Sequence, residues 1–134
     1  MTRSQAREGA FMLIFEHIFN PEYTLEDMKE LSDGSDVIMI NGFTEQLYVK
    51  TTENLESIDE EIKKYLKNWK LERLPKTALA ILRLAFSEIT YFDGVPESVS
   101  VNEAVELAKK YAGEKDASFI NGVLGSFIRS GNKE

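Results

Sequence analysis

The sequence predicts an all-α fold of about seven helices that pack as two small helical bundles. Apolar residues recur at three- and four-residue spacing along most of the chain, and no segment sustains the alternation typical of a β-strand. Only three prolines interrupt the 134 residues. The expected connections between helices are short, as they are in bundles.

The first three helices follow from their start and stop signals. The first covers about residues 2–20 and ends before Pro21, because proline cannot continue a helix. The second begins with Thr24 as N-cap, followed by acidic residues, and ends before Ser32. The third is expected over residues 35–54, and Gly42 inside it costs about 1 kcal/mol relative to alanine. Either two helices pack closely at Gly42 or the helix is weak there.

The fourth and fifth helices are separated by Pro75. Ser57-Ile58-Asp59-Glu60 has the pattern of a capping box, which predicts the start of the fourth helix. Its apolar side continues at helical spacing through Leu66 to Trp69. The fifth helix, which Pro75 is well placed to open, has the most regular apolar stripe in the chain, from Ala78 to Ile89.

The last two helices are divided by Gly113. Ser100-Val101-Asn102-Glu103 is a second capping-box pattern and predicts the start of the sixth helix. The seventh is expected from Asp116 or Ser118 onward. We expect residues 1–55 to form an N-terminal bundle of helices one to three. Residues 56–134 then form a C-terminal bundle of helices four to seven, within one compact unit.

The composition excludes several classes of protein. The chain has no cysteine, so it has neither a disulfide nor a thiolate metal site, and a single histidine, His17, cannot make a multi-histidine site. No apolar run approaches the roughly 20 residues of a membrane span, and no signal peptide is visible, so we expect the cytoplasm. Motifs of hydrolases, metalloproteases and nucleotide-binding enzymes are absent. We therefore expect no enzyme, no cofactor and no metal.

The net charge of −7 is unevenly distributed. Residues 21–60 carry eleven acidic residues and two lysines, whereas residues 61–134 carry twelve basic and ten acidic residues. Residues 1–20 are balanced. The acidity thus belongs to one segment, and both ends of the chain can meet a polyanion such as RNA.

Two groups of residues are candidates for RNA contact. Arg3 and Arg7 stand one turn apart on the first helix, where a basic face could meet phosphate or simply be solvated. Lys115, Ser118 and Phe119 lie near the start of the last helix, where a partly exposed aromatic beside a lysine can stack an unpaired base. The alternative for Phe119 is a place in the core.

Other polar residues favour a structural explanation or leave the question open. Arg83 lies at the edge of the apolar stripe of the fifth helix. This position predicts that its guanidinium joins two helices through a structural ion pair. Asn121 and Gly122 are poor helix formers inside a helical pattern, and close helix packing at Gly122 would explain them. The lysines and arginine between Lys63 and Lys76 either extend an RNA surface or form a solvated face.

Five sequence blocks together resemble the NusB family over the full length of the chain. Their order and spacing carry the resemblance more than any one block does. The blocks are T-R-S-Q-A-R-E-G-A from Thr2, W-K-L-E-R-L from Trp69, I-L-R-L-A-F-S-E from Ile81, V-N-E-A-V-E-L-A-K-K from Val101 and S-F-I-N-G-V-L from Ser118.

The resemblance implies a non-enzymatic, RNA-binding transcription antitermination factor. Members of the family pair with NusE, a small-subunit ribosomal protein, and the heterodimer binds the single-stranded boxA element of ribosomal RNA leaders. This assembly is part of the antitermination complex of RNA polymerase. By position, the resemblance assigns the RNA surface to Arg3, Arg7, Lys115, Ser118 and Phe119. It assigns the NusE-facing surface to Phe15, Tyr65 and Leu66.

Two alternatives to this function remain open. A NusB-like domain also occurs fused ahead of RNA methyltransferases, so the chain could be an accessory domain of such an enzyme. It could also be a protein-interaction module with weak RNA binding, since only Arg3 and Arg7 stand where many family members have a denser arginine cluster. With so few arginines, we expect the RNA affinity of the isolated chain to be low and its dependence on NusE to be correspondingly greater.

Overall fold

The computed structural model describes residues 2–32 and 42–131, and over these ranges it is all-helical, which confirms the predicted fold class. Its elements are α1 (Arg3–Phe19), α2 (Leu25–Ser32), α3 (Gly42–Glu53), α4 (Leu55–Lys63), the short 3-10 helix η1 (Leu71–Arg73), α5 (Lys76–Tyr91), α6 (Glu97–Tyr111) and α7 (Glu114–Arg129).

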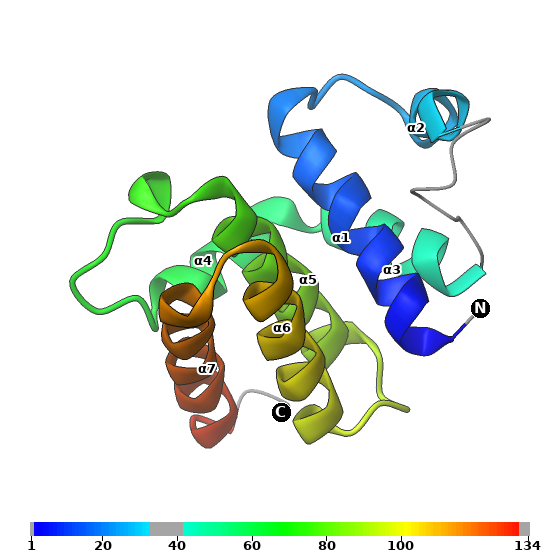
Figure 1. The fold of residues 1–134 in the computed structure, drawn as a ribbon. Helices are drawn as coiled ribbons and strands as arrows, with labels where there is room; N and C mark the ends of the chain where they lie inside the picture. The colour runs from blue at the N-terminus through cyan, green and yellow to red at the C-terminus, as the bar shows by residue number, and fades with distance from the viewer. Residues whose placement is uncertain (1, 33–41, 132–134) are drawn as a thin grey trace.

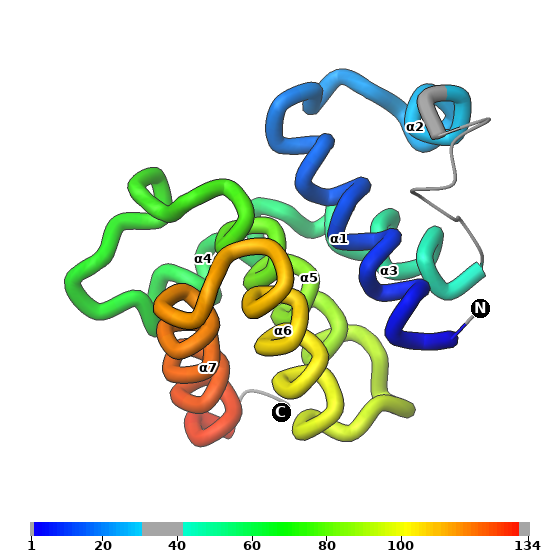
Figure 2. The backbone as a smooth tube through the Cα atoms, in the orientation of Figure 1, coloured from blue at the N-terminus to red at the C-terminus, as the bar shows by residue number. Residues whose placement is uncertain are grey.

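Helix α5 is the centre of the molecule. It contacts α1 and α3 on one side and α4, α6 and α7 on the other, as the ribbon in Figure 1 and the backbone trace in Figure 2 show. Every residue from Ala78 to Ile89 is buried except Arg83, which is partly exposed. One apolar cluster therefore runs through both halves of the chain. A division into two bundles after residue 55 remains a proposal, in which α5 supplies the shared core.

The first two helices begin where their caps predict. The Thr2 hydroxyl accepts a hydrogen bond from the Gln5 backbone N–H at 3.0 Å, and the Gln5 side chain accepts one from the Thr2 N–H at 2.8 Å. Thr24 and Asp27 exchange the same pair of bonds at the start of α2. These reciprocal bonds satisfy backbone donors that a helix start leaves unpaired.

The two capping boxes predicted at Ser57 and Ser100 are wrong. Helix α4 begins at Leu55, so Ser57 lies inside it and is exposed. Helix α6 begins directly after Pro96, so Ser100 lies within the helix, where it is buried. Proline favours the start of a helix, and at Pro96 this signal outweighs the serine four residues later.

Two further expectations about helix limits need correction. Helix α4 ends at Lys63 and does not continue to Trp69, and Lys67 adopts a left-handed backbone with φ of 58°. Among the described residues α3 begins at Gly42, while the predicted start near Ser35 lies outside them. A Cβ built on Gly42 would meet nothing within 4 Å, so close helix packing does not explain this glycine.

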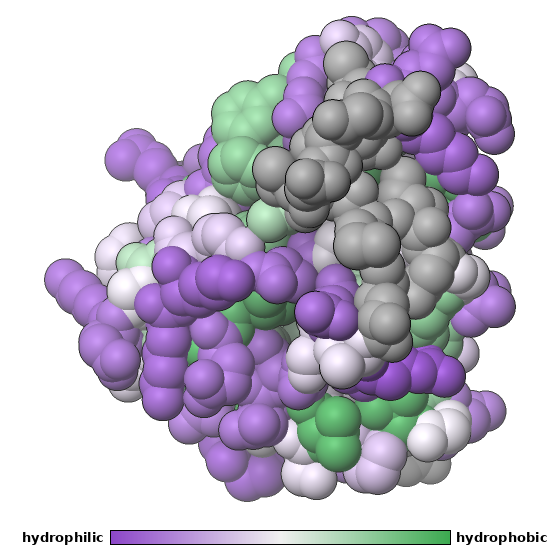
Figure 3. All heavy atoms as spheres, turned by 45° about the vertical axis from the view of Figure 1, so that its right-hand side comes forward, coloured by the Kyte–Doolittle hydropathy of each residue, from purple (hydrophilic) through white to green (hydrophobic). Residues whose placement is uncertain are grey.

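The surface is mostly polar. On the face that Figure 3 shows, hydrophilic side chains predominate and apolar side chains form separate patches. The large apolar residues that stand out as exposed within the described ranges are Phe19, Trp69 and Val99. In this part of the chain no helix has both the length and the apolar character needed to cross a bilayer.

Candidate nucleic-acid interface

The first two turns of α7 present the predicted RNA-contacting residues together. Gly113 adopts a φ of 105° between α6 and α7, a left-handed conformation that glycine adopts without steric cost. The chain reverses there. Lys115 and Ser118 are exposed and Phe119 is half-buried, while Ala117 and Ile120 face the core. This surface thus combines a cation, a hydroxyl and part of an aromatic ring.

Trp69 extends this surface from a different part of the chain. Its indole contacts the Phe119 ring edge-on, with 6.0 Å between ring centroids. The segment that follows α4 brings it there, passing beside α7 in Figure 1. Trp69 is 58% exposed, so the expectation that it points inward is wrong. A signal was present in the sequence, because lysines stand at positions 67 and 70 beside this tryptophan.

The basic stretch from Lys63 to Lys76 divides into two parts. Lys63 pairs with Glu60 at 3.0 Å and Lys64 with Glu61 at 2.5 Å, one turn apart on α4. Lys67, Lys70 and Lys115, in contrast, are exposed and make no ion pair with any carboxylate in the described ranges. The lysines near Trp69 and Phe119 are therefore available to meet phosphate. Arg73 and Lys76 are also exposed and without an ion pair in the described ranges.

At the other end of the chain, Arg3 is exposed and Arg7 is not. The Arg3 guanidinium lies over the Phe43 ring, 3.8 Å from its centroid, in a cation–π contact that leaves its edge open to solvent. Phe43 is held in turn by an edge-on contact with Phe92 at 5.9 Å. Arg3 is thus a pre-positioned cation that can bind a phosphate.

The placement of Arg7 argues against its predicted role in RNA contact. It is 4% exposed, and its Nε donates to both carboxylate oxygens of Glu88, at 3.0 and 2.9 Å. Its Nη2 lies 2.7 Å from Glu88 Oε2, and Glu88 is itself only 1% exposed. A guanidinium enclosed in this way joins α1 to α5 and cannot reach a phosphate without leaving its partner.

Polar contacts also attach α1 to α6. Ser4 donates to Glu103 at 2.9 Å, and Lys110 donates to Glu8 at 2.6 Å. Tyr111 donates a second hydrogen bond to the Glu8 carboxylate. The bonds from Lys110 and Tyr111 lower the pKa of Glu8, because they stabilise its charged form. Helix α6, which carries Glu103, therefore lies between α1, where Arg3 is placed, and the first turns of α7.

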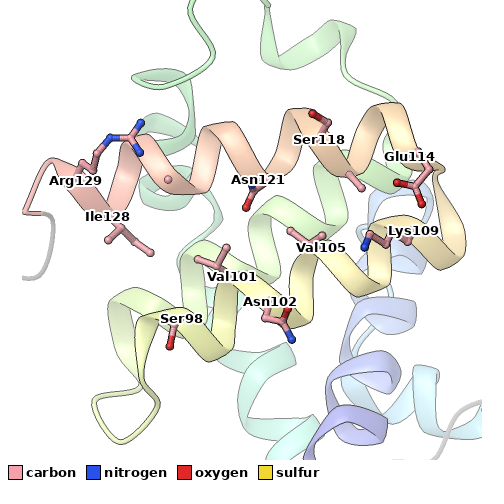
Figure 4. Close-up of a pocket in the computed structure, with 12 residues that line it drawn as sticks. Ser98, Val101, Asn102, Val105, Lys109, Glu114, Ser118, Asn121, Ile128 and Arg129 are labelled. Carbon is pink, nitrogen blue, oxygen red and sulfur yellow. The ribbon is translucent and has the colours of Figure 1, made fainter.

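A shallow groove of about 600 Å³ runs between α6 and α7 and is bordered by Ser118 (Figure 4). Val101 and Val105 of α6 line it, and Asn102 and Asn121 carry amides at its sides. The groove adds apolar contact area and hydrogen-bonding groups next to the cationic surface.

The prediction that two helices pack closely at Gly122 is wrong. The residue is exposed, and a Cβ built on it would meet nothing within 4 Å. The ion pair predicted for Arg83, in contrast, is present. Its guanidinium makes two hydrogen bonds to Asp59, at 2.9 and 2.8 Å, and so joins α5 to α4.

Comparison with known proteins decides the family. The NusB family model matches residues 4–129. The chain belongs to the NusB family. It is 42% identical to the transcription antitermination protein NusB of Natranaerobius thermophilus, over 99% of both chains. It is 44% identical to the protein of the same name from Clostridium botulinum, over 96% of this chain and 100% of the relative.

A solved structure supports the same assignment. The fold matches a chain in a crystal structure of the antitermination factors NusB and NusE in complex with dsRNA, with a TM-score of 0.83 and 26% identity. The match covers 96% of both chains. The two relatives are thus named for antitermination, and the solved structure that this fold matches contains NusB, NusE and double-stranded RNA.

The residues that the NusB resemblance assigned to a protein partner differ in accessibility. Leu66 is 2% exposed and belongs to the core, so we leave it out of the proposed partner surface. Tyr65 is half-buried against Phe127, and its hydroxyl lies 2.9 Å from Ser130 Oγ. Phe15 is half-buried and contacts Phe19, with 5.1 Å between ring centroids. Phe15 and Tyr65 are thus the partly accessible members of the predicted set.

Proposed function

We propose that this NusB-family protein is an RNA-binding antitermination factor that acts with NusE on single-stranded, boxA-type RNA of ribosomal RNA leaders. The observation that carries the proposal is the surface of Lys115, Ser118 and Phe119 on α7, which joins a lysine without an ion pair in the described ranges to a partly exposed ring. An antitermination factor works where transcription takes place, so we keep the cytoplasm as its expected compartment.

The proposed RNA surface consists of Lys115, Ser118, Phe119 and Arg3. Lysine and arginine supply the phosphate attraction that dominates nucleic-acid affinity. The Phe119 ring supplies a face for a base, and Ser118 a hydroxyl for hydrogen bonding. Arg7 is left out of this surface because Glu88 encloses its guanidinium.

We prefer single-stranded RNA on physical grounds, although the related complex contains a duplex. A base can stack on Phe119 only when it is unpaired, because the bases of an A-form helix are stacked on one another. Contacts of lysine with phosphate alone would not distinguish the two forms. A preference for the single strand would therefore depend on the aromatic ring.

The proposed NusE-facing surface centres on Phe15, with Tyr65 as a second candidate. Phe19, next to Phe15, is 55% exposed and enlarges the apolar area on α1. Partly exposed aromatic side chains are enriched at protein interfaces. The net charge of −7 also favours a basic partner over an acidic one.

Two reciprocal variants test this proposal. Phe119→Ala should weaken binding of boxA-type single-stranded RNA while NusE binding and the melting temperature stay nearly unchanged. Phe15→Ala should weaken NusE binding and leave the RNA affinity of the isolated protein intact. Fluorescence anisotropy of labelled RNA at low salt and calorimetry with NusE measure the two affinities. Equal RNA binding by wild type and Phe119→Ala would contradict the proposed RNA surface.

A protein-interaction module with weak RNA binding is the second candidate. The acidic segment at residues 21–60 favours it, because like charge opposes RNA. In that case NusE would bind while the protein added nothing to the RNA affinity of NusE. The methyltransferase alternative gains no support, since both relatives matched over nearly their whole length are named antitermination proteins.

A further inference from the structure

We infer that Trp69 and Phe119 together form a two-ring stacking surface for unpaired bases of single-stranded RNA. This inference rests on the proposed function and adds a residue, Trp69, from the segment between α4 and η1. It also adds the lysines on either side of that residue. The surface brings together two segments 50 positions apart in the sequence through one ring contact.

Exposure distinguishes Trp69 from the other large aromatics near it. The indole is 58% exposed, whereas Phe86 and Phe127 are fully buried. Its neighbour Leu66 is 2% exposed, so the same segment places a leucine in the core and leaves the tryptophan at the surface. The edge-on contact with Phe119, at an interplanar angle of 68°, fixes the indole on one side and leaves ring surface free for a base.

The local backbone supports this arrangement. Lys67 is the one non-glycine residue in the described ranges with a positive φ, a conformation that side chains other than glycine disfavour. This left-handed residue ends the helical turn after Leu66. The backbone N–H of Trp69 then bonds to the Leu66 carbonyl at 3.1 Å. The segment is therefore ordered before any ligand arrives, which reduces the entropy cost of binding.

Exposed lysines with no ion pair in the described residues lie near the rings and favour a polyanion, with Glu72, Glu114 and Asp116 as their acidic neighbours in sequence. Lys67 and Lys70 stand on either side of Trp69 in sequence, and Lys115 lies one turn before Phe119. All three are exposed, and none has a carboxylate partner in the ranges that the structure describes. Lysines beside stacked rings are the combination by which proteins bind single strands. The net charge of −7 would attract a basic protein to other parts of the surface. Next to Lys67, Lys70 and Lys115, a basic protein is disfavoured.

The experiment uses Trp69 as its own reporter, because the chain contains a single tryptophan. Intrinsic fluorescence is followed while a boxA-type single-stranded RNA is added to the full-length protein, with and without NusE. We expect the single strand to quench the emission and a duplex of the same sequence to quench it much less. Trp69→Ala should lower the affinity for the single strand about tenfold, the usual cost of losing one stacked base.

Two variants complete the design. Trp69→Phe keeps an aromatic face and should retain most of the affinity for single-stranded RNA. If side-chain size alone mattered, an aromatic residue would not be required at this position. Tyr23→Ala removes a partly exposed aromatic between α1 and α2, outside both proposed surfaces, and should leave RNA binding unchanged. Melting temperatures of all variants show whether each is folded.

The outcomes separate this inference from the function on which it rests. RNA binding that neither quenches Trp69 nor depends on it overturns the stacking surface and leaves the proposed function standing. If Trp69→Ala loses affinity for NusE and keeps its affinity for RNA, the stacking surface is also overturned, because Trp69 would then contact a protein. Failure of the wild type to bind single-stranded RNA, even with NusE, overturns both.

Discussion

At the scale of single residues, the two N-terminal arginines show how equal spacing can lead to different roles. Arg3 and Arg7 lie one turn apart, which predicted a shared basic face. In the structure Arg3 is exposed over Phe43, while Arg7 is 4% exposed and paired with Glu88. The decisive partner, Glu88, is 81 positions away, so no local pattern could distinguish the two arginines.

Removing the Arg7 side chain should therefore destabilise the protein. Arg7→Ala leaves the Glu88 carboxylate buried without its partner, which costs about 3–5 kcal/mol. We expect the melting temperature to fall by about 12–20 °C. Thermal and urea unfolding followed by circular dichroism measure the change.

A surface ion pair supplies the control for this prediction. Lys63→Ala removes the partner of Glu60 on an exposed face of α4 and should leave the melting temperature unchanged. Replacing Arg7 and Glu88 together with methionine should cost less than Arg7→Ala, because no charge stays buried. A negligible loss of stability in Arg7→Ala would show that this pair does not hold α1 on α5.

At the scale of elements, α5 was predictable and the starts of α4 and α6 were not. The regular apolar stripe of α5 reflects its central position, where burial on several sides leaves little choice of residue. Capping-box patterns are short, and a serine followed by glutamate also occurs inside helices. At Ser100 the competing signal was Pro96, and nothing in the four-residue pattern showed which of the two would prevail.

Helix α7 offers a test of one such element-level correction. Gly122 is exposed and a Cβ there would meet nothing within 4 Å, so Gly122→Ala should stabilise α7 by about 1 kcal/mol. The melting temperature should then rise by about 4 °C. Gly125→Ala is the matched comparison. Its Cβ would lie 3.1 Å from the Arg129 guanidinium, so the gain should be smaller. A fall in stability for Gly122→Ala would restore the close-packing account.

At the scale of the whole molecule, the arrangement of charge matters more than the net value of −7. The sequence showed that acidity is concentrated in residues 21–60, but it could not show which lysines already have partners. The structure divides them. Lys63 and Lys64 each pair with a glutamate one turn earlier at the end of α4, whereas Lys67 and Lys70 are unpaired in the described part of the chain and stand beside Trp69. The division depends on where α4 ends, which the sequence did not show, because the chain has left the helix by Lys67.

This division predicts a difference in salt dependence. Replacing Lys67, Lys70 and Lys115 with glutamine should reduce the slope of log affinity against log salt by about 2, because each single-strand phosphate contact contributes about 0.7. Replacing Lys63 and Lys64 should change the slope little. RNA titrations at four or five salt concentrations, with NusE present, measure it. Equal slopes for the two variants would show that these lysines do not distinguish an RNA-facing surface.

The most direct test of the central claim is the ratio of affinities for boxA-type and scrambled single-stranded RNA, measured for the complex with NusE at one fixed salt concentration. Sequence is read at the bases, whereas attraction to phosphate is shared by every RNA. We predict that the complex binds the boxA-type strand at least tenfold more tightly than the scrambled strand. Equal affinities, with NusE bound, would contradict the account.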